Sequence, residues 1–122
     1  MRLSFSAANT ESDVELFFVN HLLKDSPYLN IPDTAVRSKE SLAAYEIDKG
    51  RSRKRYIPDF DVYCDGLPVL VVETKNPEET LDDGYAEAQL YASELNKQFP
   101  ADIHPAKWVL ATNGRDLVCG RW

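Results

Sequence analysis

The sequence is poor in the features that would place a chain in a membrane or stabilise it with disulfides. Its 122 residues include two cysteines, Cys64 and Cys119, which show no metal-ligand spacing. No apolar run approaches the roughly 20 residues that a membrane-spanning helix needs. The N-terminus lacks the basic and apolar regions of a signal peptide. We therefore expect a cytoplasmic protein with no membrane partner, in which both cysteines are free, buried thiols.

The chain also lacks the basic surplus that is typical of domains that bind phosphates, because its formal net charge is −6. That charge is distributed unevenly: acidic residues concentrate at 11–15 and 78–87. Four basic residues lie within five positions: Arg51, Arg53, Lys54 and Arg55. Two interpretations of this basic run are open, namely a solvated hairpin arm and a contact with nucleic-acid phosphates.

The strongest pattern lies in the centre of the chain. Residues 58–64 and 69–75 are rich in β-branched and aromatic residues, which is typical of strands. The intervening residues, 65–68, begin with Asp-Gly and end with proline, so they predict a turn and hence a β-hairpin.

This hairpin places charged side chains together at one edge of the predicted sheet. Because side chains alternate along a strand, Glu73 and Lys75 share a face, and a short hairpin brings Asp59 beside Glu73. Two carboxylates and an amine suit a hard divalent cation and a phosphate. The alternative is an ordinary cross-strand ion pair at a sheet edge.

The other periodic segments predict one domain with a mixed sheet. Residues 11–24 have helical periodicity after an N-cap at Thr10, and a longer helix is expected from Asn76-Pro77 to Phe99. The expected strands are about 42–48, 55–64, 68–75, 108–112 and 116–119, the first three consecutive and antiparallel. A helical crossover must then join the next strand to the sheet, which predicts an α/β fold with a mixed sheet and helices on its faces.

The residues of the central hairpin resemble a known nuclease signature. Pro58-Asp59, followed after thirteen residues by Glu73-Thr74-Lys75, resembles the PD-(D/E)XK motif. The words Ile-Pro-Asp-Phe, Val-Val-Glu-Thr-Lys-Asn-Pro and Leu-Ala-Thr-Asn-Gly make the chain similar to the N-terminal nuclease domain of type I restriction enzyme R subunits. The resemblance spans about Glu11 to the end, and it implies a restriction-endonuclease-like αβββαβ core, which the predicted order of elements matches.

The resemblance implies an endonuclease that uses Mg²⁺, with Mn²⁺ as a substitute, to hydrolyse DNA phosphodiester bonds. Asp59, Glu73 and the backbone carbonyl of Thr74 would hold the cation. Lys75 would orient or deprotonate a water molecule, or stabilise charge in the transition state. In this family a glutamate of the first helix often faces the site. Glu11 best matches that position, although Glu11 and Glu15 both lie on the apolar stripe and could equally extend to solvent.

Two further residues are candidates for DNA contact. R-subunit domains often carry a glutamine and, four residues later, a tyrosine on the second helix. Gln89 is the candidate here, either for a DNA contact or as a residue that supports the catalytic site, although Ser93 stands where the tyrosine is expected. Asn113 belongs to an Asn-Gly turn, for which a structural role and a phosphate contact are both open.

The functional alternatives are a Holliday-junction resolvase or repair nuclease of the same superfamily, and a nuclease-like DNA-binding module without catalysis. The sequence contains no Walker-type phosphate loop and no helicase motif, so ATP enters only if a translocase region lies outside this chain. The expected partners are DNA and the modification and specificity subunits of a restriction complex.

Overall fold

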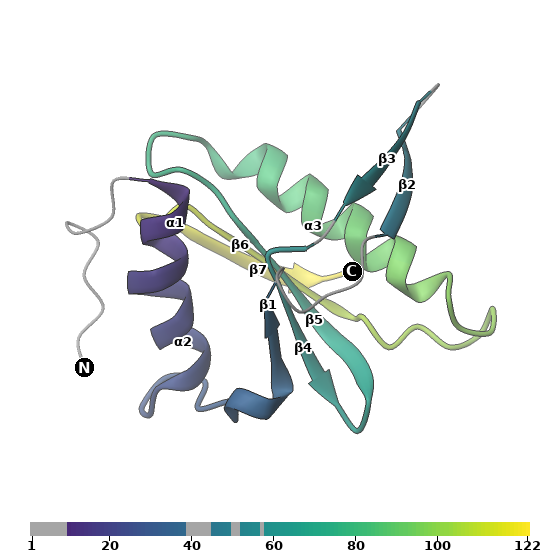
Figure 1. Ribbon diagram of the computed structural model, residues 1–122, viewed down its shortest axis with the longest axis horizontal. Helices are drawn as coiled ribbons and strands as arrows, with labels where there is room; N and C mark the ends of the chain where they lie inside the picture. Colours follow the sequence, from purple (N-terminus) through teal and green to yellow (C-terminus); the bar gives the residue numbers. More distant parts are fainter. Residues whose placement is uncertain (1–9, 39–44, 50–51, 57) are drawn as a thin grey trace.

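A computed structural model describes residues 10–38, 45–49, 52–56 and 58–122 of the chain (Figure 1). Its centre is a five-stranded sheet in the order β1-β4-β5-β6-β7. The strands are β1 (Val36–Ser38), β4 (Phe60–Cys64), β5 (Leu67–Thr74), β6 (Trp108–Thr112) and β7 (Leu117–Arg121). The β5–β6 pair is parallel and the other pairs are antiparallel, so the mixed α/β fold and the restriction-endonuclease-like core expected from the sequence are confirmed.

The first helix runs through three segments: α1 (Glu11–Val14), the π-helical η1 (Glu15–Val19) and α2 (Asn20–Lys24). Its range is the predicted one, and the Thr10 hydroxyl caps it by accepting a hydrogen bond from the Asp13 amide at 3.2 Å. A π-turn contains an extra residue. The buried stripe therefore passes from Val14 and Phe18 to Leu23 and not to Leu22, which is only partly buried.

The central hairpin forms as predicted. Asp65 and Gly66 both have positive φ, 52° and 80°, which is the conformation of a tight two-residue hairpin turn. The register pairs Phe60 with Val72 and Asp61 with Val71. It places the start of β4 beside the end of β5, which is the edge where the candidate site lies.

The predicted strands before the hairpin need correction. Residues around Tyr45 and Ile47 do form a strand, β2 (Tyr45–Lys49), but it pairs with β3 (Ser52–Tyr56) in a separate two-stranded sheet. The predicted strand 55–64 is thus divided between β3 and β4. In the main sheet, β4 pairs with the three-residue edge strand β1, which follows the short 3-10 helix η2 (Asp33–Ala35).

The second predicted helix is shorter than expected. α3 spans Leu81–Asn96, whereas residues 76–80 form a turn in which the Asn76 side chain accepts a hydrogen bond from the Glu78 amide at 3.0 Å. Asn-Pro therefore begins a turn here and not a helix. α3 provides the expected crossover between the parallel strands β5 and β6.

Two apolar clusters on opposite faces hold the helices against the sheet (Figure 1). On one face the first helix packs on Phe60, Val62, Val72 and Leu110. On the other, α3 packs through Ala88, Tyr91, Ala92 and Leu95 on Val71 and Val109. Successive residues of β5 therefore face different helices, which decides where each side chain of Glu73-Thr74-Lys75 can act.

The prediction about the cysteines is partly wrong. Both thiols are free, but both are exposed. Cys64 ends β4 next to the hairpin turn, and Cys119 lies on the edge strand β7. None of the helices within the described ranges is long and apolar enough to cross a membrane.

Candidate functional site

Two hydrogen bonds link Asp59 to the end of β5, one to Thr74 and one to Glu73. The Thr74 amide donates to Asp59 Oδ2 at 2.7 Å, and the Asp59 amide donates to Glu73 Oε1 at 3.3 Å. Both carboxylates are buried, with 8% of Asp59 and 5% of Glu73 exposed. The hairpin thus brings together the two carboxylates that the alternation and register predict.

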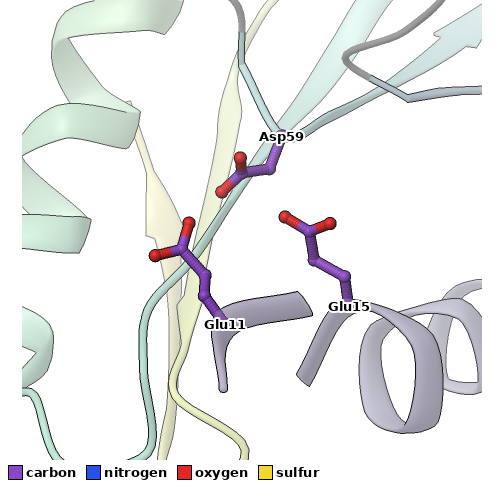
Figure 2. Close-up of side chains that lie close together, drawn as sticks. All are labelled: Glu11, Glu15 and Asp59. Atoms are coloured by element: carbon purple, nitrogen blue, oxygen red, sulfur yellow. The ribbon is translucent and has the colours of Figure 1, made fainter. Parts of the chain in front are cut away.

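The first helix adds two more carboxylates to Asp59. Figure 2 shows the side chains of Glu11 and Glu15 pointing toward Asp59. One carboxylate oxygen from each of the three residues lies within 4.8 Å of the other two. Glu11 and Glu15 are both half-buried. The geometry therefore favours the interpretation in which the glutamate side chain faces the site and does not extend to solvent. This interpretation applies to Glu15 as well as to Glu11.

Electrostatics at Glu73 favour its neutral form in the metal-free protein. Burial and the adjacent Asp59 carboxylate raise the pKa of Glu73 to about 10, although the Asp59 amide partly offsets them. A cation next to this carboxyl group would replace the proton, since metal ligands bind in the deprotonated form.

The residues around Asp59 fit a hard cation. Carboxylate oxygens are the ligands that Mg²⁺ prefers, and Asp59, Glu11 and Glu15 supply three within a short distance. Thr74 lies on the first-helix side of β5, in alternation with Val72, and its fully buried hydroxyl has no hydrogen-bond partner. A buried hydroxyl without a hydrogen-bond partner destabilises the fold, so this oxygen also indicates a further polar ligand or ion at this edge.

Lys75 lies on the other side of β5, beneath α3. Its Nζ forms an ion pair with Glu87 Oε2 at 3.1 Å, and only 15% of the lysine side chain is exposed. Burial lowers the pKa of Lys75, but the hydrogen bond and charge of Glu87 outweigh it, so the net shift is upward. Lys75 is therefore an ammonium ion at neutral pH.

Glu87 is not among the site residues predicted from the sequence. The only signal is its spacing, because Glu87 precedes Tyr91 by four residues, the separation expected of the family's glutamine and tyrosine, with glutamate in the first position. Gln89 lies elsewhere on α3. Its exposed side chain lines a hollow of about 260 Å³ together with Tyr85 and, from β7, Val118.

The contacts of Asn113 favour its structural interpretation. Its side-chain amide donates to the Glu79 carbonyl at 2.7 Å, and its side-chain oxygen accepts from the amides of Arg115 and Asp116. It therefore fixes the β6–β7 turn and ties that turn to the segment before α3. A contact with DNA phosphate stays a prediction.

The basic run lies on the β2–β3 hairpin. Arg53, Lys54 and Arg55 belong to β3, and the register places Arg53 opposite Asp48 and Arg55 opposite Glu46. Arg51 is outside the described residues. In Figure 1 this hairpin projects from the body of the fold beside α3.

The mixed sheet with a helix on each face is that of a restriction-endonuclease-like core. The family model described as Type I restriction enzyme R protein N terminus (HSDR_N) matches residues 42–121. The chain belongs to this family, as its resemblance predicted. The first helix, with Glu11 and Glu15, precedes the matched range. No curated protein and no solved structure gives a significant match.

Proposed function

We propose that the chain is a metal-dependent DNA endonuclease domain of the type I restriction R-subunit kind. The observation that carries this proposal is the convergence of Asp59, Glu11 and Glu15 beside the end of β5, where Glu73 lies and which Lys75 follows, in a chain of the R protein N-terminal family. A lone ion pair would not need carboxylates from the first helix and from both strands of the hairpin.

Asp59 would hold Mg²⁺, or Mn²⁺ in its place, together with Glu73, the Thr74 carbonyl and the glutamates of the first helix. The bound cation would supply charge neutralisation and lower the pKa of a coordinated water molecule. Before the cation binds, Glu73 must give up its proton. Its burial against Asp59 means that a bound cation would compete with this proton.

Lys75 would act as a hydrogen-bond donor and not as a base. Its ion pair with Glu87 favours the ammonium form, which can orient the attacking water or stabilise charge on the phosphate oxygens. DNA would be bound in part by Arg51, Arg53, Lys54 and Arg55. The proposed further partners are the modification and specificity subunits, and ATP enters only through a translocase region outside this chain.

A resolvase or repair nuclease of the same superfamily would share this chemistry, and the family match favours the restriction alternative. The test is nicking of supercoiled plasmid by the purified chain in Mg²⁺, in Mn²⁺ and in EDTA. We expect nicking in either metal, none in EDTA, and a loss of about 100-fold or more in Asp59→Asn. Nicking that persists in EDTA, or an Asp59→Asn protein as active as wild type, would contradict the proposal.

A further inference from the structure

We infer that Gly84 and Glu87 of α3 are positioning residues that fix the Lys75 ammonium group, an inference that rests on the proposed function. The two lie three positions apart and therefore on the same face of the helix. Gly84 faces the aliphatic stem of Lys75, and Glu87 forms an ion pair with its charged end.

Gly84 makes room for the stem of the lysine. A Cβ atom built at this position would lie 3.0 Å from Lys75 Cγ and 3.3 Å from Cε, closer than side chains normally approach. Glycine in the middle of a helix is otherwise unfavourable, since it loses more conformational freedom on folding than alanine. The close approach to Lys75 accounts for a glycine at this buried position.

Glu87 fixes the end of the same side chain. Its carboxylate accepts from Nζ at 3.1 Å in a partly buried setting, where 15% of the lysine and 28% of the glutamate side chain are exposed. A charge-assisted hydrogen bond that is shielded from water holds its donor more firmly than an exposed one. Lys75 is thus held between its own strand and one face of α3.

α3 offers a matched control for this pair. Glu94 Oε1 accepts from Lys97 Nζ at 2.9 Å on the same helix, but 71% of that lysine side chain is exposed. Replacing Glu94 removes a glutamate–lysine ion pair of similar length from the same helix, and the ion pair does not involve Lys75. A change that Glu87→Ala causes and Glu94→Ala does not is therefore due to the contact with Lys75 and not to a general change in α3.

The first measurement needs neither metal nor DNA. In protein with ¹³C-labelled lysine, assigned with a Lys75→Arg variant, we expect the Lys75 ε-methylene to be ordered and to show a nuclear Overhauser effect to the Glu87 side chain. Glu87→Ala should abolish both signatures and Gly84→Ala should shift the Lys75 signals, whereas Glu94→Ala should leave them unchanged. A Lys75 side chain equally ordered and unshifted in Glu87→Ala and Gly84→Ala would overturn the inference.

The second measurement is plasmid nicking at saturating Mg²⁺ and DNA. We expect Glu87→Ala and Gly84→Ala to lower the rate about 10- to 100-fold with DNA affinity little changed. The thermal midpoint of Gly84→Ala is measured beside the rate, because the gain in helix propensity and the crowding of Lys75 change stability in opposite directions. Glu87→Gln retains an acceptor for the ammonium and should recover most of the rate.

The two measurements separate the inference from the proposed function. If wild-type protein does not nick DNA, the proposed function fails, and the lysine signals alone decide whether α3 positions Lys75. If Lys75 becomes mobile in Glu87→Ala while nicking continues at the wild-type rate, its positioning has no part in the reaction and the inference is wrong.

Discussion

Asp61 is a buried carboxyl group two positions after Asp59 on β4. Its side chain is fully buried, and neither carboxylate oxygen has a hydrogen-bond partner. Burial raises the pKa of Asp61 from 3.8 to about 7. The folded protein therefore keeps this proton over a pH range in which the unfolded chain has already lost it.

A pH-dependent stability follows from Asp61. As pH rises from about 4 to about 7, the unfolded chain releases the proton and the folded chain holds it, so the free energy of unfolding should fall by a few kcal/mol. Glu73 adds a decline that continues to higher pH. Asp61→Asn should match wild type near pH 4 and exceed it in stability at pH 8.

Urea denaturation at pH 4, 6 and 8 checks this prediction, with Asp102→Asn at an exposed position as the control. A wild-type protein whose stability is the same at pH 4 and pH 8, or an Asp61→Asn protein that shows the full wild-type decline, would mean that Asp61 is ionised or solvated in the folded state.

At the scale of the elements, the β2–β3 hairpin is the place to test DNA affinity. Its basic residues should neutralise phosphates regardless of base sequence, because they lie on an arm outside the main sheet. Replacing Arg51, Arg53, Lys54 and Arg55 by alanine should weaken binding to unrelated DNA sequences alike and flatten the salt dependence of the affinity. Fluorescence anisotropy over a range of salt concentrations measures both.

Lys97→Ala is a suitable control, since it removes an exposed charge that lies at the C-terminal end of α3 and not on the hairpin. If the four-residue variant retains the wild-type salt dependence, the basic run is a solvated arm, which is the other interpretation of this segment.

The elements that local pattern could predict are those whose signal is contained in the segment itself. The β4–β5 hairpin has strong strand residues on both sides of Asp65-Gly66, and the first helix has a cap and an apolar stripe. β2 was predicted as a strand, but periodicity does not reveal its partner, and it pairs outside the main sheet. β1 has three residues, too few to show a period.

The site residues likewise divide into those that local sequence predicts and those that only the packing of separate elements brings together. Asp59, Glu73 and Lys75 could be predicted because one hairpin relates them, and alternation fixes their faces. Glu11 was placed by family resemblance, and Glu15 was left open with it. Glu87 belongs to a different element, and only the packing of α3 on β5 brings it to Lys75. A contact of this kind carries no local signal.

At the scale of the whole molecule, the candidate site requires both helical layers. Glu11 and Glu15 reach Asp59 from the first helix, and Glu87 reaches Lys75 from α3 on the opposite face of the sheet. The Glu73-Thr74-Lys75 segment at the end of β5 connects the two sides. Loss of either helix should therefore remove part of the site even if the hairpin persists.

The most direct test of the nuclease account is the nicking rate of Lys75→Ala relative to wild type at saturating Mg²⁺ and DNA. Lys75 holds no cation, so its removal should leave the carboxylates in place. We predict a loss of about 100-fold or more, with DNA affinity little changed and a cooperative unfolding transition retained. A Lys75→Ala protein that nicks DNA at the wild-type rate would contradict this mechanism. So would a wild-type protein that does not cleave DNA and that Lys75→Ala only destabilises.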